Sequence, residues 1–140
     1  MLAIRGAVDA IVVEMGVTYM GVDVECEGRT IWSPSLRVGY LFYDEIKALE
    51  KVVNVPSGVT SFIADMIKVD EHAFDEFVRT VLAYLSKTNN APLLAMSSRC
   101  VEIAIALRAE ITGCWPEVSG NLEPFLERSR RIMGSMEYYL

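Results

Sequence analysis

The sequence predicts a mainly α fold, a bundle of five to six helices with one small β-hairpin near residues 17–32. Three observations favour it. Apolar residues recur at helical spacing over most of the 140-residue chain, capping and stop residues bracket those segments, and β-type alternation is confined to one stretch. The alternative is an α+β fold with a larger antiparallel sheet. Because no linker or repeat divides the chain, we expect residues 1–140 to form a single domain.

The first predicted element is a helix over residues 1–14, with Gly16 as its stop signal. A strand over residues 10–13 is the competing interpretation, because Val and Ile are also good strand formers. Apolar residues then alternate with Asp23 and Glu25, and a turn at Glu27 and Gly28 closes the predicted hairpin. The apolar residues at helical spacing in the first element are Leu2, Ile4, Val8, Ile11, Val12 and Met15.

Helical signals dominate the rest of the chain. Helices are predicted over residues 42–53 and 59–68, and three more begin at the capping residues Asp70, Asn90 and Asn121. The Asn90-capped helix is expected to run to residue 112, be apolar over a wide arc and lie centrally. The Asp70-capped helix follows the i, i+3, i+4 rule throughout, with its inward residues at Phe74, Phe77, Val78, Val81, Leu82 and Leu85.

Composition and charge exclude several classes of protein. The hydrophobic fraction is 52%, but no stretch approaches the roughly 18 consecutive apolar residues of a membrane span. The net charge of −6 divides into −7 over residues 1–76 and +1 over residues 77–140. An acidic protein repels phosphate backbones, so nucleic-acid binding is not expected. With no targeting segment recognised and an odd number of cysteines, we expect a cytoplasmic protein with reduced thiols.

The glycine pair Gly16 and Gly21 has the spacing that opens a phosphate-binding loop. Val22 and Asp23 follow it, where such a loop needs Lys and Ser or Thr, so the nucleotide interpretation is rejected. His72 is the sole histidine and sits among four carboxylates over residues 70–76, which we interpret as a capped first helical turn rather than a metal site. No cofactor and no metal ion are therefore predicted.

Nucleophilic catalysis would need the imidazole of His72. The candidate thiol is Cys26, which we expect near solvent, whereas Cys100 lies in an apolar helical segment. This dyad has no local signature, so no catalytic residue is assigned and the protein is expected not to be an enzyme. The remaining charged cluster is basic and consists of Arg128, Arg130 and Arg131.

The leading functional hypothesis is a non-enzymatic cytoplasmic helical protein that acts through self-association or a protein partner. A homo-oligomer is expected, with a dimer favoured, because a short and highly apolar chain has too little interior to hide its apolar surface. A small-molecule-binding protein or enzyme using the acidic N-terminal half is the first alternative. A nucleic-acid-associated regulator acting through the arginine cluster is the second. The predicted interface residues are Met136, Tyr138, Tyr139 and Leu140.

Overall fold

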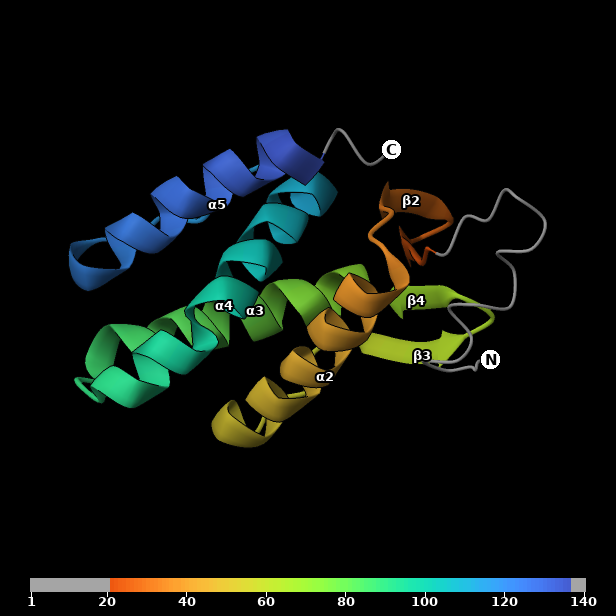
Figure 1. Ribbon diagram of the computed structural model, residues 1–140. Coiled ribbons are helices and arrows are strands. Elements are labelled where there is room, and N and C mark those ends of the chain that lie inside the picture. The colour runs from red at the N-terminus through yellow and green to blue at the C-terminus, as the bar shows by residue number, and fades with distance from the viewer. Residues whose placement is uncertain (1–20, 137–140) are drawn as a thin grey trace.

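The computed structural model describes residues 21–136 as an α+β fold (Figure 1). The predicted mainly α bundle with a single hairpin is therefore wrong, because a four-stranded sheet accompanies the helices. The predicted helix over residues 1–14 lies outside the described residues, as do residues 137–140. The elements are β1 (Asp23–Cys26), β2 (Arg29–Trp32), α2 (Leu36–Val53), β3 (Val59–Ile63), β4 (Met66–Val69), α3 (Glu71–Lys87), α4 (Ala91–Thr112), the short 3₁₀ helix η2 (Gly120–Leu122) and α5 (Glu123–Met136).

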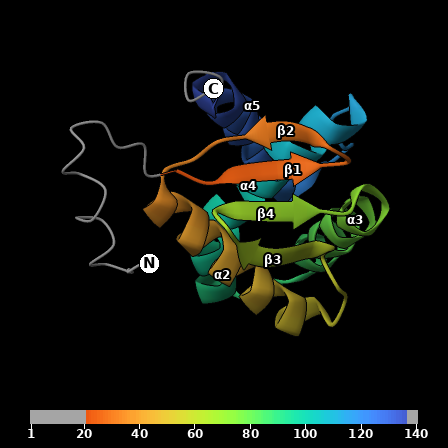
Figure 2. The same cartoon turned by 90° about the vertical axis from the view of Figure 1, so that its right-hand side faces the viewer.

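The sheet is mixed, with the strand order β2-β1-β4-β3. Two antiparallel hairpins, β1–β2 and β3–β4, meet through a parallel pairing of β1 with β4. The alternative prediction, an α+β fold with a larger antiparallel sheet, has the correct fold class. It is wrong about the sheet, because the central pair of the observed sheet is parallel. Helices α3, α4 and α5 lie behind the sheet in Figure 2, and α2 runs past its β3 side.

The sequence predicted one of the two hairpins and missed the other. The β1–β2 hairpin was predicted correctly, and its turn at Glu27 and Gly28 has φ values of 53° and 82°, as a type I′ turn requires. The helix predicted over residues 59–68 is wrong, because this segment is the β3–β4 hairpin. Its turn uses Ala64 and Asp65 at φ values of 55° and 58°. Neither is glycine, and Ala64 is not a turn-forming residue, so the turn signal there is weak.

Helix caps account for most of the helix boundaries. The predicted caps Asp70 and Asn90 are confirmed, because their side chains accept hydrogen bonds from the backbone N–H groups three residues later at 2.9 and 3.0 Å. Asn121 is not a cap. Its side-chain amide donates to the carbonyl oxygen of Leu85 at 3.4 Å, and the chain enters α5 through η2 instead.

The hydrophobic core lies between the sheet and the helices, with α4 at its centre as predicted. This helix contacts α2, α3, α5 and β2, and its segment from residue 104 to residue 107 is completely buried. All six apolar residues predicted to face inward from α3 are also buried. Within residues 21–136, no helix is both long and apolar enough to cross a membrane.

The loop between α2 and β3 is held by one carboxylate. Glu50 of α2 accepts hydrogen bonds from both the backbone N–H and the hydroxyl of Ser57, and another from Lys47. Partial burial pushes the pKa of Glu50 upward, but these hydrogen bonds outweigh it and hold the pKa below its ordinary value. The loop is therefore stabilised above the unfolded-state pKa of this carboxyl group, and that contribution is lost as the pH falls through the folded-state pKa.

Candidate functional site

The outward side of α2 carries an apolar stripe. The stripe has five positions, which are three or four residues apart along the helix. Glu45 occupies the middle position. The other four positions are apolar: Val38, Leu41, Ala48 and Val52. Leu41 is 60% exposed, and Met96 of α4, beside the far end of the stripe, is 81% exposed. We call the four apolar α2 residues together with Met96 the α2 face. Large apolar side chains this exposed are typical of contact surfaces.

A second stripe on the same helix explains why the α2 face points outward. Leu36, Phe42, Ile46 and Leu49 pack into the core, so the helix is held by one side and leaves the other open. Gly39 lies on the inward stripe, where an added Cβ would come within 2.9 Å of Val22. The absence of a side chain at this position lets α2 approach the sheet closely.

A hollow adjoins each end of the α2 face, and both hollows have volumes of about 230 Å³. Near the C-terminal end of α2, the hollow lies between α2 and α4 and includes Val52, Leu93 and Met96. Near its N-terminal end, the hollow includes Trp32 and Val38. Each depression is mainly apolar and has the size of one or a few side chains, so the α2 face could bind protruding side chains of a partner.

The predicted interface residue Met136 lies at this second hollow. It ends α5 and is buried, with Ile132 and Val38 lining the same depression. The other predicted interface residues, Tyr138, Tyr139 and Leu140, lie outside the described part of the chain. The structure thus brings Met136 to the edge of the α2 face.

The predicted helices left out two of the five residues of the α2 face. The helix was predicted to begin at residue 42, which left Val38 and Leu41 in a loop, whereas α2 begins at Leu36. Ser35 caps the helix by accepting a hydrogen bond from the N–H of Val38 at 3.3 Å. A helix start at Ser35, combined with the three-and-four spacing from residue 38 to residue 52, is the signal that could have revealed the stripe.

A separate acidic cleft lies where the parallel strands β1 and β4 end side by side. Its volume is about 270 Å³, and its lining residues are Glu27, Asp70, Glu71, His72, Asp75 and Thr112. Cys26 ends β1 beside it, so both residues of the candidate dyad reach this region. No hydrogen bond joins Cys26 to His72 within residues 21–136. A thiol among several carboxylates is a donor set suited to a divalent cation.

The thiols are placed differently from what the sequence predicted. Cys26 is buried rather than near solvent, Cys100 is buried as expected, and Cys114 is the exposed thiol. Cys26 ends β1 with its side chain on the inner face of the sheet, alongside Val24. Burial raises the pKa of Cys26, and Glu71 and Glu27 raise it further. Burial also raises the pKa of Cys100, with Glu45 contributing.

We therefore expect Cys114 to react first with a thiol reagent in the native protein, because it is exposed and the thiolate is the reacting form. Cys26 should follow, and Cys100 should react last. A time course of mass spectra after peptide digestion measures this order, with Cys114→Ser as the control that removes the fast phase. A fast phase that survives in Cys114→Ser would contradict the placement of Cys26.

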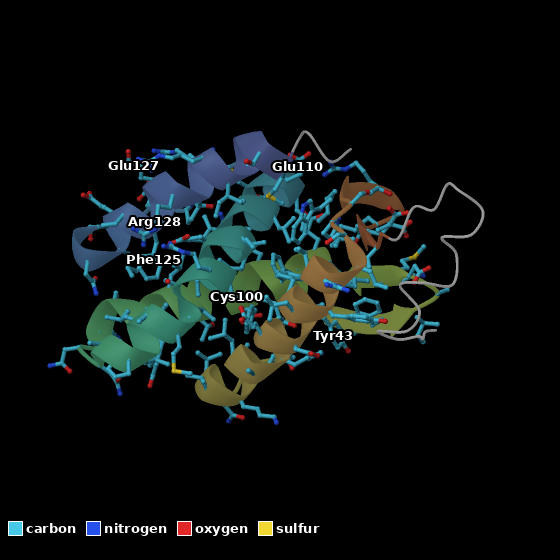
Figure 3. The ribbon with its side chains drawn as sticks, in the orientation of Figure 1. Tyr43, Cys100, Glu110, Phe125, Glu127 and Arg128 are labelled. Carbon is cyan, nitrogen blue, oxygen red and sulfur yellow. The ribbon has the colours of Figure 1, made fainter. Side chains whose placement is uncertain are left out.

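Ion pairs within the chain account for the charges on α4. Glu102 is buried and lies between two arginines, accepting hydrogen bonds from Arg99 at 2.9 Å and from Nε of Arg128 at 2.5 Å. Figure 3 shows Arg128 and Phe125 extending from α5 toward α4, and the guanidinium lies 5.5 Å from the centre of the Phe125 ring. The hydroxyl of Ser129 also donates to the carbonyl oxygen of Glu102. This cluster joins α4 to α5.

The arginine cluster of α5 is divided among contacts within the chain. Arg128 pairs with Glu102, Arg131 pairs with Glu127 at 3.3 Å, and Arg130 lies over the ring of Trp115. The three side chains thus have three separate partners. This arrangement gives less support to the nucleic-acid alternative than a shared basic surface would.

Comparison with known proteins places the chain in a family. Neither the curated proteins nor the solved structures gave a match to it. A family model described as "Family of unknown function (DUF6086)" matches residues 20–138, a range that contains all the described elements and therefore both the α2 face and the acidic cleft. The chain is a member of the DUF6086 family.

Proposed function

We propose that this protein is a non-enzymatic cytoplasmic protein that acts by binding a second copy of itself through the α2 face. The observation that carries the proposal is the exposed apolar stripe along the length of α2, with a hollow at either end. The three cysteines are free, which suits a reducing compartment such as the cytoplasm.

A second copy of the chain suits this surface because the surface has both protruding apolar side chains and hollows that could receive them. Leu41 and Met96 protrude from it, and the two hollows can each receive a protruding side chain. In a two-fold dimer the same patch is used by both partners, so each copy offers both protrusions and hollows to the other. The three-and-four spacing also suits packing of two helices at a shallow angle.

The predicted C-terminal interface extends the same surface. A stable dimer buries about 800 Å² on each partner, more than one helix stripe provides. Tyr138, Tyr139 and Leu140 follow Met136, whose side chain lines the hollow beside Val38. We propose that these three residues add contact area next to α2. Tyrosine suits this role because it gives large contact area with little loss of side-chain freedom.

Charge sets how this association should respond to salt. Each chain carries a net charge of −6, so two copies repel at long range. One acidic group, Glu45, lies within the stripe; it is partly buried and lines the hollow between α2 and α4 together with Cys100. Added salt screens the repulsion between copies and leaves the apolar contact intact. The dimer should therefore become tighter as the ionic strength rises.

Replacing Leu41 with aspartate should weaken the dimer at least about tenfold, because a central exposed anchor would be exchanged for a charge. Ile63→Asp is the matched control. Ile63 is also a highly exposed apolar residue, but it ends β3 and lies outside the α2 face. Sedimentation equilibrium of the wild type and both variants measures the change, and melting temperatures confirm that both variants are folded.

A wild type that is monomeric up to about 100 μM would overturn the proposal, as would an Ile63→Asp variant that dissociates as readily as Leu41→Asp. The chain has one competing occupant of its own, the apolar segment over residues 1–14. A double variant with Val8→Asp and Val12→Asp tests it. One outcome would identify this segment as the occupant: the wild type is monomeric, and only the double variant binds a hydrophobic dye. The N-terminal segment would then cover the α2 face, and self-association through that face would be excluded.

A further inference from the structure

The parallel pairing of β1 with β4 brings three potential metal ligands together. Cys26 is the last residue of β1 and pairs in register with Val69, the last residue of β4. Glu27 follows the first strand, and Glu71 follows the second after one residue. Because the carboxyl ends of parallel strands meet at one edge of a sheet, these side chains converge although they lie up to 45 positions apart in the sequence.

The ligand atoms are close to one another. The sulfur of Cys26 and one carboxylate oxygen from each of Glu27 and Glu71 all lie within 4.8 Å of one another. Cys26 is only 3% exposed, and within residues 21–136 its thiol makes no hydrogen bond. A buried thiol that lies within 4.8 Å of two carboxylate oxygens and has no hydrogen-bond partner in the described part of the chain distinguishes this cluster from an ordinary acidic surface.

Within the described residues, no ion pair neutralises the carboxylates of this cluster. The neighbouring Asp75 is paired with Arg108 and Arg79, and Asp70 accepts the capping hydrogen bond of α3. By contrast, Glu27 and Glu71 form no ion pair within the described part of the chain. The two carboxylates therefore repel each other next to the thiol, and a bound cation would remove that repulsion.

We propose that Cys26, Glu27 and Glu71 bind a divalent transition-metal ion, with Zn²⁺ as the best match. A thiolate ligand favours Zn²⁺ over the oxygen-seeking Mg²⁺ and Ca²⁺. Tetrahedral Zn²⁺ with one sulfur and two oxygen ligands places these atoms about 3.6 Å apart, as follows from its bond lengths. The distances between the ligand atoms would need to shorten by about 1.2 Å at most. Both glutamates are exposed and can move that far, and the fourth ligand would be water or the imidazole of His72, which lines the same cleft.

Binding would be coupled to loss of the thiol proton. The S–H bond breaks, the sulfur binds the metal ion, and one proton is released to solvent. Burial, Glu71 and Glu27 raise the pKa of Cys26, Asp70 adds to this, and Arg29 lowers it. The thiol is therefore protonated at neutral pH, so the apparent affinity should rise about tenfold per pH unit while it remains so. Because His72 lines the same cleft and is a candidate fourth ligand, the pH dependence is also measured in His72→Ala, which isolates the contribution of the thiol.

Cobalt titration of the full chain tests the proposal. Co²⁺ should produce a thiolate-to-cobalt charge-transfer band that saturates at one equivalent and is displaced by Zn²⁺. Zn²⁺ at a hundredfold excess over its dissociation constant should raise the melting temperature by about 9 °C. Cys26→Ser should abolish the band, and Glu71→Gln should weaken binding about 100-fold or more.

Two variants serve as matched controls. Cys114→Ser removes the exposed thiol, and Glu76→Gln removes an exposed carboxylate one turn along α3 from the cluster. Both should keep the band and the affinity. The proposal is overturned if the wild type gives no band, if the band survives in Cys26→Ser, or if Cys114→Ser removes it. Equal stabilisation of wild type and Cys26→Ser by Zn²⁺ would also overturn it, since the thiol would then not be a ligand.

Discussion

Replacing Arg128 with methionine should destabilise the fold by about 3 kcal/mol, because the change leaves a buried carboxylate without its closest partner. The side chain of Glu102 is 1% exposed, and Nε of Arg128 lies 2.5 Å from its carboxylate. Arg99 also contacts Glu102, but its own side chain is mostly in solvent, so it cannot replace the lost shielding. Urea unfolding measures the loss, with the slope checked for constancy between variants.

Arg131→Met is the matched control, since Arg131 lies on the same helix and pairs with an equally exposed Glu127. Its loss should be at most about 0.5 kcal/mol, as for other exposed i, i+4 pairs. The double variant Glu102→Met, Arg128→Met should recover most of the stability, because it removes the buried charge together with its partner. If the double variant is less stable than Arg128→Met, the explanation is wrong. The loss in Arg128→Met would then not come from leaving the carboxylate of Glu102 buried without a partner.

The helices that the sequence predicted well are those whose signals are local. In α3, the Asp70 cap and the regular apolar spacing lie within one segment, and the structure agrees with both. The same holds for α4, from Asn90 to the left-handed Gly113 at its end. Each of these signals acts over four residues or fewer along the chain. Sequence alone can therefore recover them without knowing what the helix packs against.

The sheet depends on relations that are not local. The pairing of β1 with β4 joins residues more than 40 positions apart, and no short pattern specifies it. In the β3–β4 segment, Phe62, Ile63 and Met66 fall at spacings that suit a helix as well as a hairpin. The hairpin forms because Val59, Ile67 and Val69 are buried against the helices, and tertiary packing then overrides the ambiguous local pattern.

The candidate sites could not be predicted from the sequence for the same reason. Cys26 and Glu71 become neighbours through the parallel pairing, so the metal-ligand cluster has no signature along the chain. The α2 face has a local signature, but recognising it requires the helix to start at Leu36 rather than at residue 42. The sequence did identify Cys26 and His72 as the residues to consider for chemistry. Both lie at the acidic cleft or beside it, although Cys26 is buried rather than accessible.

Gly58→Ala should destabilise the fold by about 3 kcal/mol, lowering the melting temperature by roughly 10 °C. Gly58 has a φ of +76°, which costs an alanine about 1 to 2 kcal/mol. An added Cβ would also lie 2.8 Å from the Cβ of Ala73 and 3.1 Å from the carbonyl oxygen of Asp70. These groups belong to the start of α3, and they cannot withdraw without disturbing the hydrogen bond from the Asp70 N–H to the Gly58 carbonyl oxygen. Overpacking of this kind costs about 1 to 3 kcal/mol more.

Gly113→Ala separates the two contributions. Gly113 has nearly the same φ, +80°, but nothing lies within 4 Å of an added Cβ, so only the backbone cost of about 1 to 2 kcal/mol applies. Urea unfolding measures the loss in the free energy of unfolding for both variants. The amount by which the loss in Gly58→Ala exceeds that in Gly113→Ala is the steric cost of separating the α2–β3 loop from α3. Equal losses in the two variants would mean that α3 shifts freely at its start. In that case the positions of Asp70 and Glu71 would not be fixed by this packing, and the acidic cleft would have to be held in shape by the β1–β4 pairing alone.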